Sequence, residues 1–189
     1  MSVSTSNQSS TGDAVDLLLA QHQEVKRLFT QVHGAAGDRA EAFECLVRLL
    51  AVHETAEEEV VYPALRSMGA EGERVAEARK AEEGKAKTDL AELEKIGVDG
   101  AGFDEKLGVF RVAVLQHATN EEQEVFPLLR ASLDPEKLTS MRSKLEKAER
   151  MAPTHPHPHG PESALGNLIV GPFVAVADRV RDALRGGKG

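Results

Sequence analysis

Two segments of the sequence repeat one pattern of histidine, glutamate, aromatic and proline residues. Residues 53–66 read HETAEEEVVYPALR and residues 117–130 read HATNEEQEVFPLLR. In each copy a glutamate, Glu57 or Glu121, follows the histidine by four positions. Residues four apart project from the same face of an α-helix, one turn from each other. Each copy therefore predicts one imidazole and one carboxylate side by side.

The helix face that carries each pair is otherwise apolar. The flanking residues are Leu50 and Val61 in the first copy and Val114 and Val125 in the second. A buried carboxylate without a partner is costly, so it pairs, changes its pKa or binds a metal. Two facing pairs, joined by His22 from another apolar stripe, would gather three imidazoles and two carboxylates. Mixed nitrogen and oxygen ligands of this kind suit iron, manganese or zinc. A carboxylate can also bridge two metal ions, which favours a dinuclear centre.

One His-x-x-x-Glu segment alone is weak evidence for a metal site. The same spacing occurs in ion pairs at the surface and in core histidines whose hydrogen bonds are made within the protein. The second copy, together with His22, favours the metal interpretation. We expect His33 to be an exposed capping residue. Four further glutamates of the two motifs are expected to be solvated, namely Glu58, Glu59, Glu122 and Glu124. Glu58 and Glu122 each follow a motif histidine by five residues, and this spacing could recruit either of them as a ligand.

Long helices must carry these residues into one volume. Apolar residues recur every three or four positions along four stretches, as in helices with one buried face. The predicted helices cover about 13–33, 38–67, 71–96 and 103–132. Glycine-containing segments and short connections between them predict an all-α, up-down four-helix bundle.

Particular residues are expected to shape the helix ends. Asp38 is a predicted N-cap, and Pro63 is expected to kink the second helix or to lie in its final turn. Asp134 followed by Pro135 predicts the start of a short fifth helix. Glu83 lies on the most apolar face of the third helix, which is otherwise the most polar of the four.

Composition limits the partners and the location. A formal net charge of -8 argues against nucleic acid as a main partner, because phosphate binding needs a clustered basic surface. We find no signal peptide and no apolar run long enough to span a membrane. The single cysteine is typical of a reducing compartment, so we expect a cytoplasmic protein. Cys45, close to Phe43 and Leu46, is expected to be a buried thiol.

The chain divides by composition into three parts. We expect a disordered N-terminus over 1–12, the bundle over 13–151, and a tail rich in Pro, His and Gly over 152–189. Alternating prolines extend the tail and separate its imidazoles, which favours a linker over a metal site. These histidines are His155, His157 and His159. An amphipathic stretch over 173–184 could pack on the bundle or on a second chain, which leaves a homodimer open.

Taken together, these residues resemble the hemerythrin-like family, also called HHE cation-binding domains. The resemblance covers roughly 13–150 and includes the Tyr62-Pro63 and Phe126-Pro127 pairs after each motif. It implies a bundle that holds two non-haem irons, bridged by carboxylates and an oxo or hydroxo group. Zinc or manganese would accept the same donors. The implied ligands are His22, His53, Glu57, Glu83, His117 and Glu121.

The third helix departs from the family pattern. The family places a histidine there, whereas this chain has none between His53 and His117. The segment 81–87 aligns with Glu83 at that position. Glu83 would then replace the imidazole and make the site more anionic. The alternative is a solvated Glu83 beside an under-coordinated metal.

The resemblance implies redox chemistry on a small oxygen species. Replacement of an imidazole ligand by a carboxylate ligand should stabilise ferric iron and weaken reversible oxygen binding. We therefore expect a catalase-like enzyme that takes hydrogen peroxide or dioxygen as its ligand. No catalytic residue beyond the metal ligands is identified, and Tyr62 could lie near the site or pack in the core. The alternatives are sensing or binding of oxygen, nitric oxide or iron without turnover, and a structural zinc site.

Overall fold

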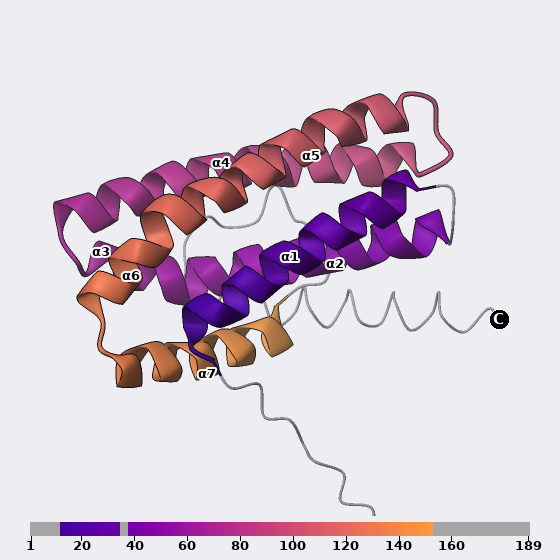
Figure 1. The fold of residues 1–189 in the computed structure, drawn as a ribbon. Helices are drawn as coiled ribbons and strands as arrows, with labels where there is room; N and C mark the ends of the chain where they lie inside the picture. The colour runs from indigo at the N-terminus through magenta and orange to yellow at the C-terminus, as the bar shows by residue number, and fades with distance from the viewer. Residues whose placement is uncertain (1–11, 35–37, 153–189) are drawn as a thin grey trace, which may run out of the picture.

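The protein is a bundle of long helices with a shorter helix across one end (Figure 1). The computed structural model describes residues 12–34 and 38–152. Its elements are α1 (Ala14–His33), α2 (Arg39–Ala56), η1 (Glu57–Val61), α3 (Tyr62–Arg66), α4 (Ala70–Ile96), α5 (Phe103–Asn120), η2 (Glu121–Val125), α6 (Phe126–Ser132) and α7 (Pro135–Met151). Residues 1–11 and the tail from 153 onward, with its three histidines, lie outside the described residues.

Two helix pairs form the body of the bundle. α1 packs against α2 and α4 packs against α5, with the chain reversing direction from each helix to the next (Figure 1). The second and fourth predicted helices are continued by further segments, as α2–η1–α3 and α5–η2–α6. α7 contacts α1, α2 and η1. The predicted all-α, up-down bundle with an additional short C-terminal helix is confirmed.

Aspartate side chains begin three of the helices. Asp13 accepts a hydrogen bond from the backbone N–H of Asp16 at 3.1 Å, and Asp16 Oδ2 accepts one from the backbone N–H of Asp13 at 2.9 Å. This reciprocal pair is a capping box. Asp38 and Asp134 each accept from the backbone N–H three residues later, which confirms both predicted N-caps. Each cap contributes about 1 kcal/mol.

A five-residue π-helical segment interrupts each helix that carries the repeated motif. η1 begins at Glu57 and η2 begins at Glu121, the two motif glutamates. Pro63 and Pro127 have no N–H to donate into the preceding turn. The residue before each proline donates its own N–H to the glutamate carbonyl five residues back. The sequence periodicity predicts continuous α-helices here, so these π segments, which often occur at functional sites, are a finding of the structure.

Two apolar clusters fill the bundle on either side of a polar layer. The cluster near α7 includes Leu18, Ala56, Val61, Leu65, Val75, Val125, Phe126, Leu129 and Leu145. The other cluster includes Val25, Phe29, Leu46, Leu50, Leu90, Leu93, Phe103, Phe110 and Val114. On each long helix a polar residue stands where one cluster gives way to the other. These residues are His22, His53, Glu83 and His117.

Cys45 is exposed, and the prediction of a buried thiol is wrong. Its neighbours Phe43 and Leu46 are buried. A helix turns about 100° per residue, so a shift of one or two positions can move a side chain from the buried face to the exposed face. Cys45 instead lies on the outer face of α2 with the exposed Glu44 and Arg48.

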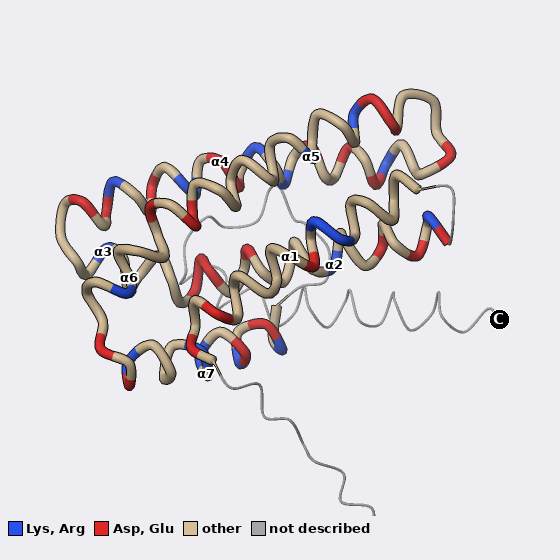
Figure 2. The backbone as a smooth tube through the Cα atoms, viewed as in Figure 1, with Lys and Arg blue, Asp and Glu red and all other residues tan. Residues whose placement is uncertain are grey.

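Charged residues of both signs are interspersed along the helices (Figure 2). Many pair within one helix, as Arg74 does with Glu71 at 2.7 Å and Lys85 with Asp89 at 2.8 Å. Such exposed pairs contribute about 0.2–0.5 kcal/mol each. Within the described ranges, no helix is both long and apolar enough to cross a membrane.

Candidate metal centre

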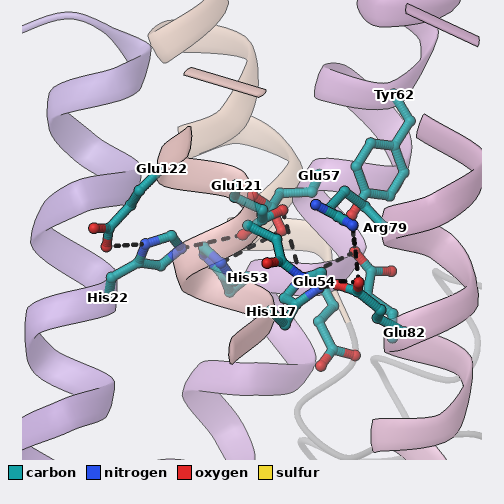
Figure 3. A network of polar contacts seen from close by, with 12 residues as sticks. His22, His53, Glu54, Glu57, Tyr62, Arg79, Glu82, His117, Glu121 and Glu122 are labelled. Atoms are coloured by element: carbon teal, nitrogen blue, oxygen red, sulfur yellow. Dashed lines mark hydrogen bonds and ion pairs between the residues drawn. The ribbon is translucent and has the colours of Figure 1, made fainter. Parts of the chain in front are cut away.

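The polar layer brings together all six residues that the sequence predicts as metal ligands. Figure 3 labels His22, His53, Glu57, His117 and Glu121 among them. The six residues fall into two groups, and the potential ligand atoms of each group lie within 4.8 Å of one another. One group is His22, His53 and Glu121, and the other is Glu57, Glu83, His117 and Glu121. Because Glu121 belongs to both, the groups are adjacent parts of one centre. Metal ligation by these residues stays a prediction.

Glu121 lies between imidazoles from two helices. Its Oε2 is 3.2 Å from His22 Nε2, and its Oε1 is 3.4 Å from His117 Nε2. Glu57 has the matching place in the first motif, with Oε2 3.4 Å from Nε2 of the histidine one turn earlier. Glu83 enters from α4, with Oε1 4.0 Å from His117 Nε2. Nitrogen and oxygen atoms from four helices thus converge on one interior space.

A contact at Nδ1 orients each imidazole. His53 Nδ1 lies 2.7 Å from Oε1 of Gln21, and His117 Nδ1 lies 2.9 Å from Oε2 of Glu82. Each of these oxygens accepts, so Nδ1 carries the proton and donates. The remaining nitrogen, Nε2, then presents its lone pair to the centre. Histidines that ligate metals are held in this way by an outer hydrogen bond.

Two of the glutamates expected to be solvated take part in this layer. Glu122 accepts a hydrogen bond from His22 Nδ1 at 3.0 Å. Glu58 forms an ion pair with Lys87, and its side chain is only 11% exposed. Each follows its motif histidine by five residues, the spacing that a π-helical turn favours. The other residues expected at the surface are exposed or half-buried, namely His33, Glu59 and Glu124.

The centre contains buried polar atoms that make no hydrogen bond. They are Nε2 of His22 and His117, both carboxylate oxygens of Glu57 and Glu121, and Oε2 of Glu83. Although several of them lie in contact, they lack the geometry of a hydrogen bond. Buried polar atoms are nearly always paired, so a cluster of unpaired ones requires an explanation. Bound cations would satisfy all of them, and the mixture of imidazole and carboxylate fits iron, manganese or zinc.

The electrostatics of the centre point the same way. Burial raises the pKa of Glu57 and Glu83 well above the usual range, and neighbouring carboxylates raise both further. Burial also lowers the pKa of His53 to about 3, aided by His22. For Glu121 burial opposes ionisation, but the three imidazoles around it outweigh burial and lower its pKa to about 2. A cation would favour the anionic carboxylates and the neutral imidazoles together.

An approximate internal twofold relates the α1–α2 half of the centre to the α4–α5 half. In each half a residue of the first helix contacts the π segment of the other half. His22 contacts Glu122, and Lys87 contacts Glu58. The matched positions are Gln21 and Glu82, His22 and Glu83, Lys26 and Lys87, His53 and His117, Glu57 and Glu121, Glu58 and Glu122, and Tyr62 and Phe126.

Sequence reasoning missed the outer residues Gln21, Glu82 and Lys87. A signal for them was present in the spacing. Gln21 and Glu82 each directly precede a predicted ligand, and Lys87 follows Glu83 by one helical turn. Tyr62 is buried and donates its hydroxyl hydrogen to Glu83 Oε1, so it both packs in the interior and borders the centre.

A pocket of about 200 Å³ reaches the centre from outside the bundle. All three histidines of the centre contribute to its lining. Apolar side chains cover most of the remaining wall, including Val25, Leu50, Ala86 and Val114. Glu54, Glu82, Lys85 and Gln116 supply its polar groups. A pocket of this size admits a small molecule to the imidazole side of the centre.

The helical bundle and the buried His/Glu centre together define a cation-binding helical domain. Residues 13–129 match the family described as Hemerythrin HHE cation binding domain. The chain belongs to that family, which confirms the resemblance seen in the sequence.

Two curated proteins and one solved structure are similar to this chain. The chain is 31% identical over 136 residues to an uncharacterized hemerythrin-like protein of Schizosaccharomyces pombe, covering 71% of this chain and 67% of that protein. It is 26% identical over 136 residues to a protein of a Nostoc species named DNA nickase, of which it spans 38%. A crystal structure of a Hemerythrin HHE cation binding domain-containing protein from Mycobacterium kansasii has the same fold. That structure matches with a TM-score of 0.66 at 19% identity, over 90% of this chain and 98% of that one.

Proposed function

We propose that the centre holds two iron ions, bridged by carboxylates and an oxo or hydroxo group, and decomposes hydrogen peroxide as a catalase does. The observation that carries the proposal is the cluster of buried nitrogen and oxygen atoms without hydrogen bonds. Their types and their number suit two cations better than one. A bound iron pair would supply the two electrons that pass between successive peroxide molecules.

The residues of the chain hold the centre and control access to it. Glu121 contacts histidines of both halves and would therefore be available to both metals. Gln21 and Glu82 hold the His53 and His117 imidazoles that would face the metals. In the overall reaction two molecules of hydrogen peroxide give one dioxygen and two waters. The protons released by the peroxide that is oxidised equal those consumed by the one that is reduced.

The pocket fits this substrate. Its apolar wall keeps bulk water away, while Glu54 and Gln116 offer oxygen and nitrogen atoms that could orient a peroxide. Its volume of about 200 Å³ excludes large organic substrates. The Nostoc relative is named for an action on DNA, and this chain spans 38% of it. Because the formal net charge here is -8, we do not extend that action to this chain.

Binding or sensing of dioxygen or nitric oxide is a second candidate. The mainly apolar pocket lining favours it, because a neutral diatomic gas needs no polar partner beyond the metal. The two candidates differ in turnover. A sensor would form one adduct for each centre, whereas a catalase would release dioxygen continuously.

The test combines metal analysis with dioxygen measurement on the full-length protein. Iron-loaded protein should contain near two irons per chain and should release dioxygen from hydrogen peroxide at half the rate of peroxide loss. His53→Ala should abolish release, because it removes an imidazole that faces the metals. Glu59→Gln is the matched control, since Glu59 lies six residues later on the same helical segment and outside the centre.

Three outcomes are informative. Full iron loading without dioxygen release would overturn the catalase proposal and leave gas binding. Zinc in place of iron would overturn both redox candidates. Equal activity in His53→Ala and in the wild type would mean that the activity arises elsewhere or from a contaminant.

A further inference from the structure

The two groups of potential ligand atoms offer different donors. The first combines two imidazoles with the Glu121 carboxylate, and the second combines one imidazole with three carboxylates. The groups differ at one matched pair, His22 on α1 and Glu83 on α4, and in Glu57, which belongs to the second group alone. His22 and Glu83 are both buried, with exposures of 2% and 1%. The exchange therefore alters the interior of the centre.

The aromatic residues that contact His22 and Glu83 differ as well. The Phe126 ring stacks on His22, with ring centroids 5.5 Å apart and an interplanar angle of 22°. At the matched place, Tyr62 donates its hydroxyl hydrogen to Glu83 Oε1. A buried phenol needs an acceptor, which a carboxylate provides and the face of an imidazole does not. The second half is thus built around a carboxylate.

A lysine also supports the carboxylate in the second half. Lys87 Nζ lies 3.8 Å from Glu83 Oε2 and 4.0 Å from Glu54 Oε2, and it also pairs with Glu58. The matched Lys26 pairs with Glu122 at 3.6 Å and is more exposed, at 39% against 23%. The Lys87 ammonium offsets part of the additional negative charge around Glu83.

We infer that the centre contains two unequal cation positions, one histidine-rich and selective for Fe²⁺ or Zn²⁺, the other carboxylate-rich and able to accept Mn²⁺. Imidazole suits iron and zinc, whereas carboxylate oxygen suits harder cations such as manganese. This inference rests on the proposed function only in requiring that the centre bind two cations. It does not require peroxide turnover.

The experiment fills one position and titrates the other. Metal-free full-length protein receives one equivalent of Zn²⁺ and is then titrated with Mn²⁺, with the electron paramagnetic resonance signal of free Mn²⁺ reporting the amount bound. The wild type should bind one Mn²⁺ per chain beside the Zn²⁺. Glu83→His with Tyr62→Phe copies the first half onto the second. It should bind Mn²⁺ about tenfold more weakly, or worse, while still taking two Zn²⁺.

The reverse exchange is the matched variant. His22→Glu with Phe126→Tyr copies the second half onto the first and should bind Mn²⁺ more tightly than the wild type when no Zn²⁺ is present. Circular dichroism shows which variant folds, and either one decides the question alone. Equal Mn²⁺ affinity in the wild type and a folded variant would overturn the inference, as would failure of the Zn²⁺-loaded wild type to bind Mn²⁺.

The outcomes also separate this inference from the proposed function. Two bound cations with the expected selectivity, but no dioxygen from peroxide, would remove the catalase proposal and keep the unequal positions. Failure of the wild type to bind any of these cations would overturn both.

Discussion

The α1–α2 half and the α4–α5 half of the bundle use one scaffold for two different sets of donors. The motif helices are nearly alike, since both place a histidine and a glutamate one turn apart and both enter a π segment at that glutamate. The helices without the motif differ. α1 contributes Gln21 and His22, whereas α4 contributes Glu82 and Glu83.

The backbone that holds the centre and the donors that set its chemistry come from different helices. The repeated motif, with its proline and its aromatic residue, fixes the backbone and the two imidazole–carboxylate pairs. α1 and α4 then decide whether a half is rich in nitrogen or in oxygen. The outer partners follow the same division, because the neutral Gln21 is bound by Glu149 of α7 at 2.8 Å and Glu82 is bound by Arg79 and Asn120.

The largest expected effect comes from the glutamate common to both groups of ligands. Glu121→Ala should reduce bound metal from two ions per chain to none, because Glu121 contacts histidines of both halves. Glu57→Ala should retain one ion, since Glu57 belongs to one group only. Mass spectrometry of the metals after dialysis measures the difference. Glu124→Ala, an exposed site on η2, is the control, and equal losses in the Glu57 and Glu121 variants would contradict the asymmetry.

Metal removal tests whether cations hold the two halves together. A cation at a hundredfold excess over its dissociation constant stabilises the fold by about 2.7 kcal/mol. For a chain of this size that corresponds to a fall in Tm of roughly 5–10 °C on chelation. Differential scanning calorimetry with and without a chelator measures it. An unchanged Tm would mean that the buried carboxylates and imidazoles satisfy one another without metal.

Exchanging the outer hydrogen-bond partners of the imidazoles, Gln21 and Glu82, should change Zn²⁺ affinity in opposite directions, with a smaller effect than loss of a ligand. Burial opposes ionisation of Glu82, but the hydrogen bond from His117 and the charge of Arg79 outweigh it and lower the pKa of Glu82. Its carboxylate therefore makes His117 a stronger ligand than the neutral Gln21 makes His53. Glu82→Gln should weaken Zn²⁺ binding about tenfold, and Gln21→Glu should strengthen it. Isothermal calorimetry provides both affinities, and a change of the same sign in both variants would refute the mirrored relation.

Much of this architecture can be read from the sequence because local rules determine it. Aspartate caps, glycine breaks and apolar periodicity predict the helices, and two motifs in register predict which faces meet. The burial of Glu83 also follows from its place on the apolar face of α4. The six predicted ligands therefore come together as expected, while their binding of metal remains to be measured.

Other features depend on tertiary contacts that periodicity does not contain. The π segments arise where a proline removes a donor, which a period of 3.6 residues does not register. The prediction for Cys45 is wrong because residues close in sequence can lie on different faces of a helix. The hydrogen bond between Tyr62 and Glu83 joins α3 to α4, so only the folded chain shows that the tyrosine and the carboxylate are partners.

The smallest expected effect tests that last pairing. Tyr62→Phe, which makes the first motif copy the second, should lower the unfolding free energy of metal-loaded protein by about 1 kcal/mol, the usual net value of one hydrogen bond. The loss should be larger in metal-free protein, because Glu83 Oε1 then has neither a cation nor the phenol as partner. Chemical denaturation with and without metal measures both. With Glu83→Ala as the second mutation, which removes the acceptor, a double-mutant cycle should give a coupling energy well above zero. A coupling near zero would show that Tyr62 and Glu83 contribute to stability independently of each other.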